Sequence, residues 1–337
     1  MSGAPAGGIL SRLKPDWYIV LIVGMVVLAS VLPARGAAAP AFGLATKVAI
    51  GLVFFLHGAK LSREAVIRGV THWRLHLLVL ASTFVLFPIL CLGLAALPAW
   101  MTPATLAPGI IFLGCLPSTI QSSIGFTAIA RGNVAGTVAS ATASNLLGIA
   151  LTPLLGALLM NGQRGGLSLH SAESIVVQLL IPFLAGQVLR RWIGGWVARN
   201  GKLLGYVDRG SILLVVYSAF SEAVVGGIWS RVSALDLFRL LVICAVLLGA
   251  VLLATVTAAR LLGFDKEDEI TIVFCGSKKS LASGVPMAGV LFPGAALGPT
   301  LLPIMLFHQI QLMACAVIAQ NYARRGQTAT DTAAETV

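Results

Sequence analysis

Ten long and nearly uncharged apolar segments follow one another along this sequence, and they constrain its fold more than any other feature. A helix needs about 20 apolar residues to cross a bilayer, and these segments are continuous rather than alternating in polarity, unlike the strands of a membrane β-barrel. Only 10% of the 337 residues are charged and 58% are hydrophobic, whereas soluble domains carry about a quarter charged residues. We therefore predict an all-α membrane protein in which residues 1–337 form a single polytopic domain within the lipid bilayer. The expected spans are Trp17–Leu32, Phe42–Leu61, Leu75–Leu97, Leu106–Ala130, Val134–Met160, Ile175–Leu189, Tyr206–Ile228, Leu235–Leu262, Ile270–Phe292 and Leu301–Tyr322.

The basic residues predict how these spans are oriented. If the spans alternate in direction, 16 of the 23 lysines and arginines fall on one side of the membrane and five on the other. Because basic loops stay in the cytoplasm, both termini are expected on the cytoplasmic side. The protein itself is expected in the inner (plasma) membrane. The net charge of +11 is then mostly a matter of topology. No basic stripe interleaved with aromatic residues is present, so we expect no nucleic-acid partner.

The first segment has an alternative interpretation. Arg12 and Lys14 precede sixteen apolar residues and then a run of alanines, 37–39, which resembles a signal peptide with a small-residue cleavage site. Cleavage would leave nine spans and place the mature amino terminus outside. The internal repeat described next needs the first span and therefore favours its retention.

A weak internal similarity recurs after about 160 residues. The segments that begin at Val53 and Val216 share an apolar run, a polar interruption, Trp, Arg and a Leu-rich end, and the segments that begin at Cys115 and Cys275 share a polar interruption of an apolar span. Five spans per half is an odd number, so the two halves, about 15–160 and 173–322, would have opposite orientations. Inverted repeats with broken helices at matching positions are typical of secondary transporters.

The fourth and ninth spans are predicted to be discontinuous. Pro117 has no amide hydrogen and removes a helical donor, and Pro286 follows the polar stretch of the ninth span. Freed carbonyls, hydroxyls and half-helix amino termini at two crossing breaks would form a substrate or ion site. The alternative is that these residues only hold helices together and bend them. The polar residues of the two breaks are Ser118, Thr119, Gln121, Ser122, Ser123, Ser277, Lys278, Lys279 and Ser280.

Lys278 and Lys279 are the sharpest functional candidates. One charged lysine at the centre of a membrane helix costs about 2.5–3.5 kcal/mol, so two adjacent lysines need water, an anion or deprotonation. Glu222 is the acidic residue well inside a predicted span and is the candidate charge partner. Lys278 and Lys279 would act as proton carriers or as fixed cations for an organic anion. Their alternative is to reach an interface by snorkelling.

An enzymatic role is not expected. The five histidines, His57, His72, His76, His170 and His308, have no zinc-like spacing, and the five cysteines lie in apolar segments without a CxxC pair, so we predict neither a metal site nor a cofactor. A further alternative is a regulatory membrane protein that does not transport a solute. In that case alanine substitutions at the two breaks should have no effect.

At these residues the sequence resembles the bile acid:sodium symporter superfamily, in its SBF-like branch of transporters. The resemblance extends from about Lys14 to Arg325, and its most specific stretches are CLPSTIQSSIGFTAIARGNVAGTV and FCGSKKSLASGVPMA. It implies ten helices in two inverted five-helix repeats. Spans one, two, six and seven would form a panel subdomain, and the other six a core subdomain in which spans four and nine cross. It also implies secondary transport of organic anions such as bile acids, usually coupled to sodium.

Several positions depart from the sodium-binding pattern that the resemblance implies. Ser122 and Ser123 stand where sodium-coupled members have Ser-Asn, and Thr137 matches a serine ligand. Ala141 replaces an expected threonine, with Thr142 adjacent, and Thr83 replaces an expected glutamine.

The ninth span departs most. Phe274 or Cys275 stands in place of the expected carboxylate, and Lys278 and Lys279 in place of Gln-Asn. An ammonium there would repel sodium. We therefore expect alternating-access transport of a small organic anion, either coupled to protons or uncoupled. The alternative is that sodium still binds, which the two lysines disfavour. Residues 326–337 are expected to form a disordered cytoplasmic tail.

Overall fold

The computed structural model describes residues 17–36, 38–60, 72–160, 176–292 and 294–334, and every regular element in these ranges is a helix. The longer helices follow the predicted apolar segments closely, and α8 has the bounds predicted for the fifth. In chain order the elements are α1 (Trp17–Val31), α2 (Ala38–Lys60), α4 (Trp73–Ala81), the π-helical turn η2 (Ser82–Leu86), α5 (Phe87–Ala95), α6 (Ala107–Cys115), α7 (Gln121–Ile129), α8 (Val134–Met160), the π-helical turn η3 (Val176–Leu180), α10 (Ile181–Arg199), α11 (Gly201–Val225), α12 (Ile228–Arg231), α13 (Ala234–Leu261), α14 (Lys266–Gly276), α15 (Leu281–Leu291), the 3₁₀ turn η4 (Gly294–Ala296) and α16 (Leu297–Ala334).

Six helical stretches of the described chain are long and apolar enough to cross a membrane. They are Ala38–Lys60, Trp73–Ala95, Val134–Met160, Gly201–Val225, Ala234–Leu261 and Gly294–Arg324. The other predicted spans contain shorter helices: α1, the pair α6 and α7, η3 with α10, and the pair α14 and α15. The division between the two predicted repeats, residues 161–172, lies outside the described residues.

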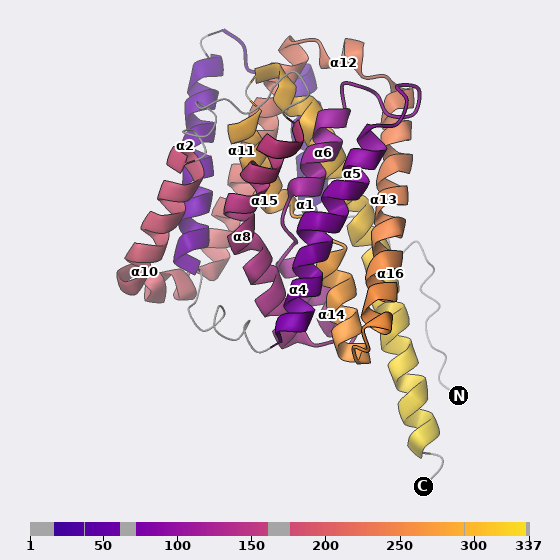
Figure 1. Ribbon diagram of the computed structural model, residues 1–337. Coiled ribbons are helices and arrows are strands. Elements are labelled where there is room, and N and C mark those ends of the chain that lie inside the picture. The colour runs from indigo at the N-terminus through magenta and orange to yellow at the C-terminus, as the bar shows by residue number, and fades with distance from the viewer. Residues whose placement is uncertain (1–16, 37, 61–71, 161–175, 293, 335–337) are drawn as a thin grey trace, which may run out of the picture.

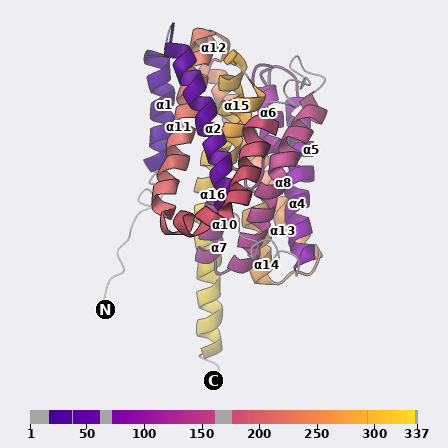
Figure 2. The ribbon, with the colours of Figure 1, turned by 90° about the vertical axis from the view of Figure 1, so that its left-hand side faces the viewer.

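The helices form two groups (Figures 1 and 2). Helices α1, α2, α10 and α11 pack against one another and make up the four-helix group. The remaining long helices, α4 to α8 and α13 to α16, make up the crossing group, so named because it contains both broken helices. Contacts of α11 with α15 and α16 join the two groups. In Figure 2, α1, α2 and α11 lie on the left and α4, α5, α8 and α13 on the right.

Two glycines set the close approach of α2 to α10. A Cβ atom on Gly58 would lie 2.0 Å from the carbonyl oxygen of Phe183, and one on Gly186 would lie 2.0 Å from the carbonyl oxygen of Phe55. Side chains of any size would force the backbones apart, and small residues at such crossings are typical of packed membrane helices. The first segment is also part of the bundle, since the Tyr217 hydroxyl of α11 donates to the carbonyl of Leu32 at 2.9 Å.

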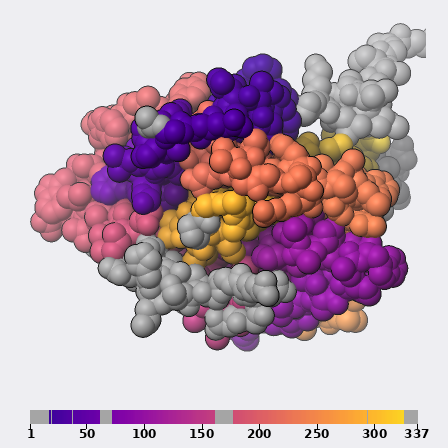
Figure 3. All heavy atoms as spheres, turned by 90° about the horizontal axis from the view of Figure 1, so that it is seen from above, coloured from indigo at the N-terminus to yellow at the C-terminus, as the bar shows by residue number. Residues whose placement is uncertain are grey.

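The bundle places apolar side chains outside and many polar ones inside. Leu253 on α13, Val188 on α10 and Leu158 on α8 are well exposed, whereas Lys278 and Lys279 are fully buried. Polar groups facing the interior of a helical bundle, with hydrocarbon on its outer surface, are expected of a membrane protein. Seen from the end where α5 connects to α6, gold atoms around the α15–α16 junction lie between the indigo amino-terminal helices and the purple α5 region (Figure 3).

The last helix continues past the predicted tenth span. Helix α16 runs through Ala334 and extends beyond the bundle (Figure 1), and the disorder expected over 326–337 stays a prediction. A helix that is already nucleated adds each further residue at little cost, and the stretch from Arg325 to Ala334 contains no proline. Residues 335–337 lie outside the described part of the chain.

Candidate functional site at the crossing of two broken helices

Both predicted breaks are present in the structure. Helix α6 ends at Cys115, Leu116 is extended with φ −72° and ψ 152°, and α7 begins at Gln121. In the ninth segment α14 ends at Gly276 and α15 begins at Leu281, so the break precedes Pro286, which lies inside α15. In Figure 2, α6 and α15 lie in the upper half of the bundle and α7 and α14 in the lower half, which places both breaks at middle height.

The first break exposes five consecutive carbonyls, and each has a donor from another part of the chain. Buried backbone groups must be hydrogen-bonded. These donors therefore explain how an unwound segment is tolerated inside a membrane protein. The pairs are Gly114 and Leu116 with the ammonium of Lys279, both at 2.7 Å, Cys115 with the Thr152 hydroxyl at 2.8 Å, Pro117 with the Ser280 amide at 2.8 Å, and Ser118 with the Asn145 side chain at 2.7 Å.

The carbonyls at the end of α14 are taken by serine hydroxyls. Ser123 donates to Phe274 at 2.9 Å, and Ser118 donates to Cys275 at 2.6 Å. Ser82 of the π-helical turn donates to Gly276 at 2.8 Å. The hydroxyl protons of Ser118 and Ser123, both predicted site residues, therefore hold the two breaks together.

Two amide side chains that were not predicted as site residues clamp the breaks. Asn145 of α8 donates to the carbonyl of Ser118 at 2.7 Å and accepts from the Ser283 hydroxyl at 2.8 Å. Gln311 of α16 accepts from the Lys279 amide and donates to the Lys279 carbonyl, both at 2.9 Å. Each is a carboxamide within a predicted membrane span, and that is the signal the sequence offers for them.

Lys279 is the best-satisfied cation of the crossing. Its ammonium donates to the carbonyls of Thr83, Gly114 and Leu116, each at 2.7 Å. It also lies 4.2 Å from the centroid of the Phe87 ring. An ammonium has three N–H donors, so its hydrogen-bonding capacity is filled by the protein backbone.

Lys278 has a different environment. Its Nζ atom is buried and has no hydrogen-bond partner among the described residues. It lies 3.9 Å from the centroid of the Phe126 ring and 5.6 Å from that of Phe274. Aromatic faces attract a cation but accept no strong hydrogen bond, so the donors of Lys278 are free for another acceptor.

The other predicted site residues divide into those at the crossing and those beside it. Hydroxyls of Thr119 and Ser122 pair at 2.8 Å, while Gln121 at the start of α7 is exposed. Thr83 contributes its carbonyl to Lys279 and directs its hydroxyl to Val79. Ser277, which follows α14, donates to the carbonyl of Val273 in that helix, and Ser280 caps α15 by accepting from the Ser283 amide.

Two predicted residues do not take part in the crossing. Thr142 is half-buried on α8 and makes no side-chain hydrogen bond among the described residues. Glu222 is exposed on α11, and no ion pair in the described part of the chain joins it to Lys278 or Lys279.

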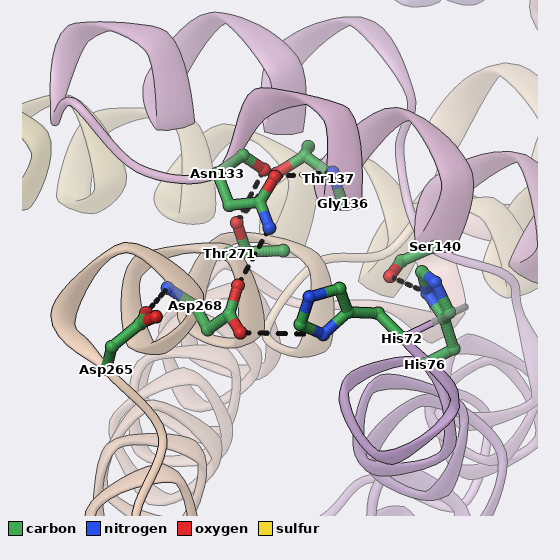
Figure 4. Close-up of polar contacts among 9 residues, drawn as sticks. All are labelled: His72, His76, Asn133, Gly136, Thr137, Ser140, Asp265, Asp268 and Thr271. Carbon is green, nitrogen blue, oxygen red and sulfur yellow. Dashed lines mark hydrogen bonds and ion pairs between the residues drawn. The ribbon is translucent and has the colours of Figure 1, made fainter. Parts of the chain in front are cut away.

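Thr137 belongs to a second polar cluster, at the end of the bundle where α14 begins (Figure 4). The hydroxyls of Thr137 and Thr271 donate to the carbonyl of Asn133, at 3.1 and 2.8 Å. The Asn133 amide donates to the buried carboxylate of Asp268 at 2.8 Å, and His72 lies 3.8 Å from the same carboxylate. This cluster fixes the start of α14 against α8 and α4.

No group of three or more His, Cys, Asp or Glu side chains in the described residues could hold a metal ion. The polar groups gathered at the crossing are backbone carbonyls, hydroxyls, two carboxamides and the two lysines.

Comparison with known proteins identifies the family of the chain. A family model described as the SBF-like CPA transporter family matches residues 16–324. An uncharacterised Pseudomonas aeruginosa protein, PA2026, is 58% identical over 96% of this chain and 98% of its own length. The Escherichia coli protein YfeH, named a putative symporter, is 54% identical over 92% of this chain and 93% of its own. A Xenopus laevis protein named sodium/bile acid cotransporter 7-B is 29% identical over 92% of each chain.

Proposed function

The chain belongs to the SBF-like CPA transporter family, and on that premise we propose that it is a secondary active transporter of a small organic anion. The four-helix group would act as the panel and the crossing group as the core, and their relative movement would give alternating access. A transporter family is also in line with the expectation that the chain is not an enzyme.

One observation carries the choice of an anion: the buried and unpaired ammonium of Lys278. A charged lysine in the middle of a membrane protein is costly unless it meets a counter-charge. Phe126 and Phe274 offer the Lys278 ammonium only ring faces. Among the described residues, no carboxylate forms a hydrogen bond with this ammonium. The carboxylate or sulfonate of an organic anion would supply the missing acceptors, and release of a proton from Lys278 would be the alternative way to remove the charge. The name of the Xenopus relative makes bile acids one candidate class.

Matched contacts in the two halves support the predicted ten spans and inverted repeat. Asn145 follows the first break and clamps it, and Gln311 follows the second break and clamps that one. Such pairing is expected where two halves are related by a two-fold axis in the membrane plane.

The ends of the helices support cytoplasmic termini. The Trp17 end of α1 and the Ala334 end of α16 lie at the same end of the bundle (Figure 2). Basic residues flank the helices at this end, and they include Lys60, Arg74, Arg199, Arg260 and Lys266. The positive-inside rule therefore favours this end as the cytoplasmic side of the inner membrane.

The proposal does not include sodium coupling of the family kind. Phe274 and Cys275 provide no carboxylate at the end of α14, and Ser123 and Ser118 already occupy their carbonyls. Two lysines follow within four residues. We propose that transport is proton-coupled or uncoupled.

The test is uptake by purified protein in liposomes of a panel of labelled anions, which includes taurocholate, cholate, a dicarboxylate and an aryl sulfate. At least one anion should accumulate above protein-free liposomes. Lys278→Met, which keeps the length of the side chain and removes its charge, should reduce that uptake by about tenfold or more, the effect of one lost interaction of about 1.4 kcal/mol. Absence of uptake for the whole panel, or equal uptake by the variant, would contradict the proposal.

A further inference from the structure

Two prolines explain why the Thr83 and Gly114 carbonyls around Lys279 lack a helical N–H donor, and the Leu116 carbonyl belongs to the extended residue that follows α6. In the π-helical turn the Phe87 amide bonds to the carbonyl of Ser82, five residues earlier. The same spacing assigns the Thr83 carbonyl to residue 88, which is Pro88 and has no N–H. In the fourth segment Pro117 interrupts the helix, and the Ser118 amide that would bond to Gly114 bonds instead to the Ser144 hydroxyl at 3.0 Å. The backbone therefore leaves this cage of three carbonyls without helical N–H donors, and the Lys279 ammonium is the donor to all three.

Rings of backbone carbonyls are ligands for monovalent cations, because they replace the oxygens of the hydration shell. Thr83, Gly114 and Leu116 present such a set, with their oxygens all 2.7 Å from one nitrogen. Three acceptors require three N–H donors, and only the protonated form of lysine has three. The charge state follows from the geometry: the occupant is an ammonium ion.

We propose that this cage is a monovalent-cation site whose permanent occupant is the chain's own Lys279. The side chain joins three segments through a single charge: the π-helical turn, the first break and the second break. A dissolved cation is then not needed to hold the carbonyls in place. The inference concerns the same crossing as the proposed transport, but it is tested by protein stability alone, so either can fail without the other.

Lys278 provides the matched comparison. It is adjacent in sequence and equally buried, but its Nζ atom contacts aromatic rings and no carbonyl within hydrogen-bond distance among the described residues. Removing it leaves no backbone acceptors without a donor, so its loss creates no cation site.

The experiment is chemical rescue of Lys279→Ala. The wild type, Lys279→Ala and Lys278→Ala are purified in detergent, and their melting temperatures are measured in ammonium, methylammonium, sodium, potassium and tetramethylammonium chlorides at equal ionic strength. Lys279→Ala should melt several degrees below the wild type. Ammonium or methylammonium should restore part of that loss, because a ligand that binds only the native state stabilises it. Tetramethylammonium, which has no N–H donor, should restore nothing, and neither the wild type nor Lys278→Ala should distinguish the salts.

A second variant covers the case in which Lys279→Ala does not fold. Lys279→Ser is expressed and purified in methylammonium throughout and then exchanged into tetramethylammonium or kept in methylammonium. Aggregation on exchange, with retention of monomer in methylammonium, is the expected result. Equal behaviour in the two salts, whether as equal melting temperatures or as equal aggregation, would overturn the proposal, and so would an equal salt response of Lys278→Ala.

Discussion

The four-helix group and the crossing group are held together by different interactions. In the four-helix group, Gly58 and Gly186 allow the backbones of α2 and α10 to touch. In the crossing group, unwound backbone is satisfied by side chains such as Lys279, Asn145 and Gln311. Close-packed backbones resist deformation, whereas polar bonds between broken helices can exchange partners. In the proposed mechanism the four-helix group would therefore be the fixed panel and the crossing group the moving core.

The largest effect is expected in the crossing group, from Gln311→Leu. The change leaves the buried Lys279 amide without its acceptor and removes the 2.9 Å donor to the Lys279 carbonyl, which keeps only His308 Nδ1 at 3.5 Å. The loss should lower the free energy of unfolding by about 2–5 kcal/mol. Titration with SDS in mixed micelles measures it. Gln309→Leu is the control on the same helix, because the buried Gln309 Oε1 has no partner among the described residues. An equal effect of the two substitutions would show that the clamp is not what stabilises the break.

In the four-helix group the matched substitution is Gly58→Ala. The added methyl would collide with the Phe183 carbonyl, and such overpacking should cost about 1–3 kcal/mol in the same titration. Gly43→Ala on the same helix is the control, since no other atom lies within 4 Å of its Cβ position. If Gly58→Ala is as stable as Gly43→Ala, the backbone contact does not hold the group together.

Asn145→Leu should have a smaller effect than Gln311→Leu, because it leaves one backbone carbonyl, that of Ser118, without its donor. We expect a loss of about 1–2 kcal/mol in the free energy of unfolding. Thr142→Val on the same helix should be close to neutral. A larger loss for Asn145→Leu than for Gln311→Leu would reverse the order of the two clamps.

The smallest effect is expected at the end of α14, from Glu269→Gln. Burial alone would raise the pKa of Glu269, but hydrogen bonds from Lys266, Arg260 and Tyr322 together lower it below the ordinary value. A lowered pKa stabilises the folded protein above the unfolded-state value of about 4.3, and that stabilisation is lost as the pH falls through the folded-state value.

Glu269→Gln should therefore cost about 1 kcal/mol at neutral pH, and the difference from the wild type should shrink on acidification below about pH 4. The exposed Glu267→Gln is the control, and unfolding titrations at several pH values measure both. A difference between Glu269→Gln and the wild type that does not depend on pH would contradict the assignment.

Much of this fold could be predicted from the sequence, because membrane spans are encoded locally. The apolar runs predicted the long helices, and Pro117 and the Ser277–Ser280 stretch predicted the two breaks. The π-helical turn at Ser82–Leu86 was not predicted, because no local pattern marks it, and in the fold it contacts the remote helices α6 and α13.

The site was predictable only in part. Lys278 and Lys279 were identified because charge is rare in membrane spans, yet nothing in their sequence separates one from the other. Their different partners come from remote segments, α4 to α6 for Lys279 and α7 for Lys278. Asn145 and Gln311 were missed because nothing in the sequence separates them from polar neighbours on the same helix, such as Thr142 beside Asn145 and Gln309 beside Gln311.

The most direct test of the account is uptake in liposomes of the best anion in the panel, with an inward sodium gradient or with potassium in its place at equal pH. The wild type, Lys278→Ala and Lys279→Ala are compared. The account predicts wild-type uptake that does not depend on sodium and that is strongly reduced in Lys278→Ala. Strong sodium dependence that survives both Lys278→Ala and Lys279→Ala would contradict it.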